Sequence, residues 1–145
     1  MNVVSKGSCR LLAGLAVAAM SPLHAASPPA AAASDAAALQ RGAQIYTRCA
    51  ACHAIDYNRT GPQHCGLFGR RAGTAPGFDG YSKAMRESNI VWNERSLDRF
   101  LTSPMQAVPG TAMGYAGIQD AQERADLIAW LRQATRPGVA CTIGR

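Results

Sequence analysis

The sequence predicts an all-α domain of three to four main helices joined by long loops. Three observations support this fold class. Apolar residues recur at a spacing close to 3.6 in separate segments, and no segment shows the alternation that is typical of a strand. Stretches rich in glycine and proline lie between the helical segments. A chain of 145 residues has room for one such domain.

The first 25 residues have the pattern of a secretory signal peptide. Lys6 and Arg10 precede a ten-residue apolar run that begins at Leu11, and Ala25 is a small residue at a plausible cleavage site. The run is too short to span a bilayer comfortably, so we expect cleavage, with an uncleaved anchor as the alternative. Residues 26–35 are rich in alanine and proline and are expected to form a flexible leader. The domain would then comprise residues 36–145.

Export would place the mature protein in the periplasm, where disulfides persist. Without Lys6 and Arg10, 13 basic residues remain against 9 acidic ones, a net charge of +4. These basic residues are scattered along the sequence, whereas nucleic-acid binding requires them to cluster. We therefore expect no nucleic-acid partner.

The first expected helix is capped by Ser34 or Asp35 and runs toward Cys49. It contains Gly42, which costs about 1 kcal/mol relative to alanine in a helix interior. A glycine at that position suggests that another backbone crosses closely. The helix leads directly into the segment that carries the chemistry.

Three further helical segments are expected. A short one begins at Ser82, and the next is capped by Asn93 and ends at Pro104. Residues 105–117 are expected to be irregular. Asp120 and Glu123 resemble a capping box at the start of the last helix, which residues 136–138 (Arg-Pro-Gly) end.

The segment that carries the chemistry is Cys49-Ala50-Ala51-Cys52-His53. Two thiols at this spacing followed by a histidine form the attachment site of a c-type haem. Each thiol adds to one vinyl group, and the histidine reaches the iron. A redox disulfide or half of a zinc site are the alternatives that the motif alone leaves open. Residues 53–70 read as a loop, and haem would supply the core material that such a chain lacks.

From about Gly42 to Ala134 the chain resembles the class I cytochromes c of mitochondria and proteobacteria. The resemblance rests on several motifs in the same order: Cys49-x-x-Cys52-His53, Gly61-Pro62, Gly66-Leu67-Phe68-Gly69-Arg70, Ala75-Pro76-Gly77-Phe78, Trp92, Pro109-Gly110-Thr111-Ala112-Met113 and the run from Glu123 to Leu131. It implies the class I cytochrome c fold, with loops wrapped around one covalent haem c.

The resemblance also implies roles for individual residues. Met113 would be the sixth iron ligand, opposite His53, and Pro62 would pack on the proximal side. Four residues match positions that neutralise or hydrogen-bond the haem propionates: Arg70, Tyr81, Trp92 and Thr111. Gly42 and Tyr46 would meet Leu127 and Trp130 where the first and last helices cross. His64 stands where the family commonly has leucine and is interpreted as a bystander, with a second axial histidine as the alternative.

Two cysteines remain after the haem is attached. Cys9 leaves with the signal peptide, so Cys65 and Cys141 form an even pair in an oxidising compartment. We predict a disulfide between them. Two independent thiols are the alternative.

Histidine and methionine together saturate the iron, so we predict a periplasmic single-electron carrier and not an enzyme. A tightly bound haem subunit of a periplasmic dehydrogenase complex is the alternative, followed by a haem peroxidase or ligand sensor. The expected partners are redox proteins that donate and accept the electron, such as a dehydrogenase, oxidase or reductase. We expect a monomer that meets the membrane only through partner complexes.

Overall fold

The computed structural model describes residues 30–138 and Cys141, together with Met1, and gives five helices in that range. Apart from Met1, the expected signal peptide lies outside the described residues. Within the described range there are two isolated β-bridges, Arg71 with Val91 and Pro137 with Cys141, and no longer strand. The all-α prediction is confirmed.

The first helix, α1 (Ala30–Tyr46), begins earlier than expected. Ser34 and Asp35 lie inside it instead of capping it, so residues 30–35 of the expected flexible leader are helical. Alanine, the strongest helix former, occupies positions 30–33 and continues the pattern toward the amino terminus. The prolines at 28 and 29 stand before the helix in the sequence.

Three of the remaining helices are preceded by a residue whose side chain caps them. Ser82 precedes α2 (Lys83–Glu87) and accepts from Met85 N. Asn93 precedes α3 (Glu94–Thr102) and accepts from Ser96 N, completing a capping box. Asp120 precedes α5 (Ala121–Ala134) and accepts from the backbone of Gln122 and Glu123. These three helices are confirmed. The capping box expected at the start of α5 is only half formed, because the Glu123 carboxylate accepts from Arg48 and not from the Asp120 backbone.

One short helix was not predicted. α4 (Pro104–Ala107) lies where the chain was expected to be irregular from residue 105 onward. Pro104 occupies its first turn, where the missing N–H is no loss and the fixed φ already suits a helix. A four-residue element leaves no periodicity that a sequence pattern could reveal.

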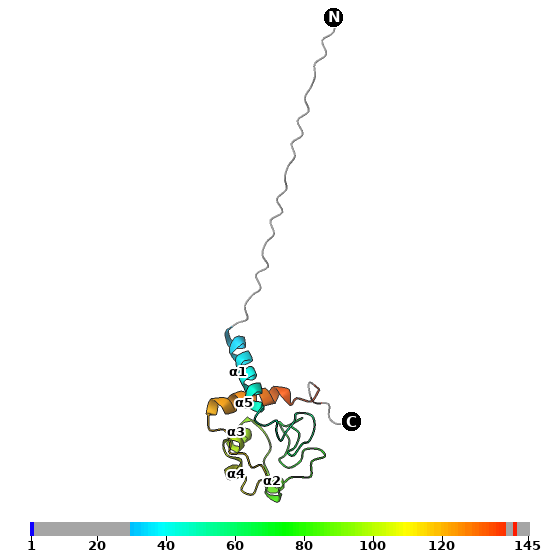
Figure 1. Ribbon diagram of the computed structural model, residues 1–145, viewed down its shortest axis with the longest axis vertical. Coiled ribbons are helices and arrows are strands. Elements are labelled where there is room, and N and C mark those ends of the chain that lie inside the picture. Colours follow the sequence, from blue (N-terminus) through cyan, green and yellow to red (C-terminus); the bar gives the residue numbers. More distant parts are fainter. Residues whose placement is uncertain (2–29, 139–140, 142–145) are drawn as a thin grey trace.

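Helices α1 and α5 cross and form the principal helix pair (Figure 1). The crossing is centred on Gly42: a Cβ built there would lie 2.2 Å from Asp126 O and 2.6 Å from Trp130 Cβ. Arg41 donates to the Asp126 carboxylate from Nε (2.5 Å) and Nη2 (3.2 Å). The absent side chain therefore permits the close approach that the mid-helix glycine predicted.

The loops complete the domain on one side of this helix pair. Residues 47–82 and 108–120 contribute many of the residues that line a cavity. Helix α3 packs against both α4 and α5 (Figure 1). Leu127 on α5 is fully buried at the centre of the core. The helices thus form a frame, and the loops supply most of the cavity wall.

Candidate haem site

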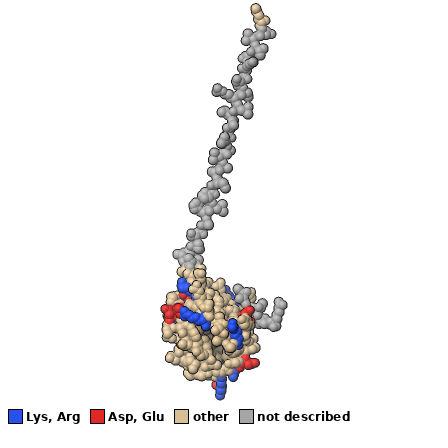
Figure 2. All heavy atoms as spheres, in the orientation of Figure 1, with Lys and Arg blue, Asp and Glu red and all other residues tan. Residues whose placement is uncertain are grey.

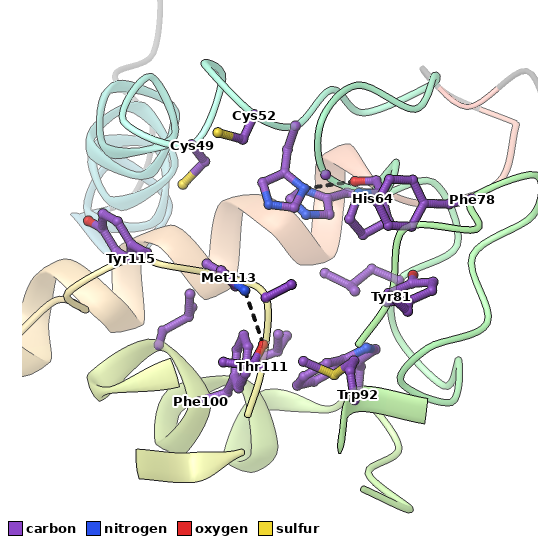
Figure 3. Close-up of a pocket in the computed structure, with 18 of the residues that line it drawn as sticks. Cys49, Cys52, His64, Phe78, Tyr81, Trp92, Phe100, Thr111, Met113 and Tyr115 are labelled. Carbon is purple, nitrogen blue, oxygen red and sulfur yellow. Dashed lines mark hydrogen bonds between the residues drawn. The ribbon is translucent and has the colours of Figure 1, made fainter. Parts of the chain in front are cut away.

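The cysteine pair lies on a helical turn that continues directly from α1. Cys49 N donates to Tyr46 O (2.8 Å), and His53 N donates to Cys49 O (2.9 Å). This turn brings both thiols to the mouth of the cavity, where Cys52 is exposed and Cys49 is partly buried (Figure 3). One turn therefore presents two sulfurs and a histidine to the same cavity.

The pKa of the Cys49 thiol tests the alternative that the cysteine pair is a redox disulfide. Burial raises the pKa of the Cys49 thiol to about 11, against a smaller lowering by Arg48. Redox-active C-x-x-C pairs need the opposite shift, because the thiolate is the reactive species. The environment of Cys49 therefore disfavours thiol–disulfide exchange.

His53 is oriented by contacts on two sides. Its Nδ1 lies 2.8 Å from Pro62 O, and because that oxygen can only accept, Nδ1–H is the donor. A Cβ at Gly61 would lie 2.4 Å from His53 Cε1, so glycine is needed behind the ring. Burial lowers the pKa of His53, while the hydrogen bond to Pro62 opposes this shift. The ring is thus held neutral, with Nε2 free to bind a metal.

The cavity has a volume of about 470 Å³ and is lined mainly by apolar side chains. Figure 3 shows Cys49, Cys52 and His64 along one wall and Thr111 and Met113 along the facing one. Thr111 Oγ1 accepts from Met113 N (3.2 Å), which braces the loop that carries Met113. A cysteine pair, a histidine and a methionine around one apolar cavity is a donor set that fits a c-type haem.

The four expected propionate partners all line this cavity. Arg70 donates from Nη1 to Cys65 O (2.6 Å) and from Nη2 to Gln63 O (2.9 Å). Its Nε is buried and has no hydrogen-bond partner among the described residues. A buried guanidinium with an unused N–H fits a site for an anionic group, so the residues present fit haem propionates.

Tyr81, Trp92 and Thr111 have other contacts in the cavity wall. Tyr81 Oη accepts from Ala75 N (3.2 Å), and the Trp92 ring packs edge-on against Phe100 with centroids 5.1 Å apart. Trp92 and Thr111 are buried. Their roles toward a propionate stay predictions, but all three residues line the cavity, as those roles require.

His64, which the sequence marked as a bystander, lies directly against His53. The two imidazoles stack with centroids 4.5 Å apart and planes inclined by 22°. His64 Nδ1 is hydrogen-bonded to Tyr46 Oη (3.2 Å). Burial, together with smaller contributions from His53 and Arg70, lowers the pKa of His64 to about 3. No periodicity or motif pairs residues 46, 53 and 64, so sequence reasoning had no signal for this cluster.

Fold and site together define a small all-α protein built to hold a covalently attached haem. A family model described as Cytochrome c matches residues 39–135. Cytochrome c of Chlamydomonas reinhardtii is 46% identical over 101 residues, which cover 67% of this chain and 89% of that protein. Cytochrome c2 of Blastochloris viridis is 42% identical over 117 residues, covering 79% and 89%.

A solved structure agrees with these sequence relatives. Cytochrome cH from Methylobacterium extorquens superposes with a TM-score of 0.63 at 34% identity, covering 66% of this chain and 97% of that one. The chain belongs to the cytochrome c family, as a class I monohaem member with one covalently attached c-type haem. It is an electron carrier and not an enzyme.

Proposed function

We propose that this protein carries single electrons in the periplasm, with His53 and Met113 as the axial ligands of its haem. The observation that carries the proposal is that His53 and Met113 both line the same apolar cavity. The haem supplies an iron that alternates between the ferrous and ferric states. The chain supplies two strong ligands, so neither state needs to gain or lose one.

The residues around the cavity also set the balance between the two states. A soft thioether favours Fe(II), and an apolar wall that excludes water disfavours the additional charge of Fe(III). The hydrogen bond from His53 Nδ1 to Pro62 O makes the imidazole a stronger donor and opposes this effect in part. These three effects set the reduction potential without any change of ligand, as a carrier that accepts and releases single electrons requires.

Carbon monoxide distinguishes this function from a haem peroxidase or ligand sensor, which needs an open iron position. We expect the ferrous protein to show no spectral change with carbon monoxide near neutral pH. Ferrous Met113→Ala protein is the positive control, because removing the thioether opens one position. Rapid binding by the unchanged protein would show that the iron is not saturated and would reject the carrier proposal.

The proposed location follows from the signal-peptide pattern of residues 1–25. Among the residues that the structure describes, no helix is long and apolar enough to cross a membrane. Acidic and basic side chains are interspersed on the face shown in Figure 2, in keeping with docking to proteins and not to nucleic acid. Redox proteins in the same compartment are the proposed donor and acceptor.

We further propose that Cys65 and Cys141 form a disulfide in the exported protein. The Cα atoms of the two residues lie 5.2 Å apart, a separation that suits a disulfide and supports the proposal. The bridge would tie the chain beyond α5 to the loop that follows His64. For a separation of 76 residues the chain-entropy model gives about 4.5 kcal/mol, and the real gain is smaller because haem attachment already restrains this segment.

Thiol alkylation under denaturing, non-reducing conditions tests the bridge. Protein freshly isolated from the periplasm should take up no alkylating reagent until it is reduced, and then two equivalents. The Cys141→Ser variant is the matched control and should take up one equivalent at Cys65 without reduction. Two reactive thiols in the unchanged protein would reject the disulfide. The intact mass of the alkylated protein, which counts the bound reagent, also reports whether residues 1–25 have been removed.

A further inference from the structure

The stacking of two imidazoles beside the haem cavity goes beyond what haem binding itself requires. His53 already has a hydrogen bond from Nδ1 to Pro62 O, but the direction of a hydrogen bond at a carbonyl oxygen is only broadly restricted. Gly61 lies behind the ring near Cε1, and rotation of the ring about its Cβ–Cγ bond is restrained in both directions only when a further group contacts the ring. His64 lies against the ring, nearly parallel to His53 at 4.5 Å between centroids.

The backbone of His64 is fixed on both sides. His64 N donates to Ala54 O (3.0 Å), and Cys65 N donates to Ile55 O (2.6 Å). Arg70 donates to the carbonyl oxygens of Gln63 and Cys65, the residues directly before and after His64. A residue whose two neighbours are held by one guanidinium has little freedom to move along the cavity wall.

The side chain of His64 is held as well. Its Nδ1 is hydrogen-bonded to Tyr46 Oη, and the Tyr46 ring packs on Trp130 of α5 with centroids 4.6 Å apart. Tyr46 is the last residue of α1 and is 92% buried, with 8% of its surface exposed. The contact chain thus runs from the crossing of α1 and α5 through Tyr46 and His64 to the face of His53.

We propose that His64, held by Tyr46, is a positioning residue that sets the orientation of the His53 imidazole plane toward the haem. The plane of an axial imidazole decides how its π orbitals overlap with those of the iron, and hence how unpaired spin spreads over the porphyrin. The proposal rests on the proposed ligation by His53. Its consequence is a ring orientation that Pro62 and Gly61 alone do not define.

The test is the pattern of haem methyl resonances in the NMR spectrum of the ferric holoprotein, which follows the axial imidazole plane. His64→Leu keeps approximately the same side-chain volume but removes the flat face and the hydrogen bond. We expect it to change the order or the spread of the four methyl shifts, or to split each signal into two. An unchanged pattern in His64→Leu would overturn the proposal.

Tyr46→Phe removes a single oxygen atom and is the milder variant. It should shift the methyl resonances in the same direction as His64→Leu and by less. If Tyr46 acts through His64, the double variant should match His64→Leu alone, because the two effects are not additive within one contact chain. Tyr57→Phe is the control, since this tyrosine is 55% exposed, and its spectrum should stay unchanged.

Two outcomes separate the positioning role from its premise and from a simple folding role. Hyperfine-shifted ring-proton signals of a ligated histidine must be present in the unchanged protein; their absence would reject ligation by His53 and not the positioning alone. If His64→Leu fails to mature with haem, Tyr46→Phe decides, and a spectrum identical to the unchanged protein overturns the proposal. A lowered melting temperature with unchanged methyl shifts would show that His64 is only packing material.

Discussion

Replacing Met113 by alanine is expected to leave the haem covalently attached and to lower its reduction potential by on the order of 100 mV or more. The attachment depends on Cys49 and Cys52, which stand on the opposite wall of the cavity. Loss of the soft thioether would remove the proposed ligand that favours Fe(II), and water entering its place would stabilise Fe(III). Potentiometric titration, with the methionine-to-iron absorption band recorded alongside, measures both effects.

Two other methionines make this test specific. Met85 is buried and lines the same cavity, so it is the competitor for the iron that the structure itself offers. Met105 is 52% exposed and lies outside the cavity lining. Met85→Leu and Met105→Ala should both keep the absorption band and leave the potential close to its original value. If the absorption band survived in Met113→Ala and disappeared in Met85→Leu, the iron ligand would be Met85 of α2 and not Met113.

The parts of the fold that the sequence predicted are those that depend on local chemistry. Ser82, Asn93 and Asp120 each cap a helix because a short polar side chain can satisfy free N–H groups of the first turn. The C-x-x-C-H motif was recognisable because a single helical turn sets its spacing. Gly42 pointed to a helix crossing because its cost in a helix interior needs a structural reason.

The parts that could not be predicted depend on contacts between distant residues. Tyr46 and His64 are 18 positions apart, and each alone is an ordinary member of a small core. They meet only because the loop folds back on itself, so that residues 64 and 65 lie beside residues 54 and 55. Two backbone hydrogen bonds join these two segments of the loop. The predicted start of α1 was wrong for a different reason. The prolines at 28 and 29 suggested an irregular leader, but the alanines that follow them favour a helix, which therefore begins at Ala30.

Replacing Gly42 by alanine is expected to destabilise the protein by about 1–3 kcal/mol, the usual cost of overpacking. Helix propensity alone predicts the opposite sign, a gain of about 1 kcal/mol. The new methyl group would lie 2.2 Å from Asp126 O, which is backbone and cannot swing aside. Denaturation of the holoprotein by guanidinium, followed by circular dichroism, gives the sign directly.

The sign of this effect decides what holds the two terminal helices together. To admit the methyl group, α1 and α5 must separate, and the ion pair between Arg41 and Asp126 at the crossing must lengthen with them. Gln40→Ala is the control, because Gln40 is an exposed residue of the same helix. It should leave stability nearly unchanged, since surface substitutions away from specific contacts usually change it by about 0.5 kcal/mol or less. If Gly42→Ala stabilised the protein as propensity demands, the helices would not be in contact at this position, and the crossing seen between α1 and α5 would be wrong.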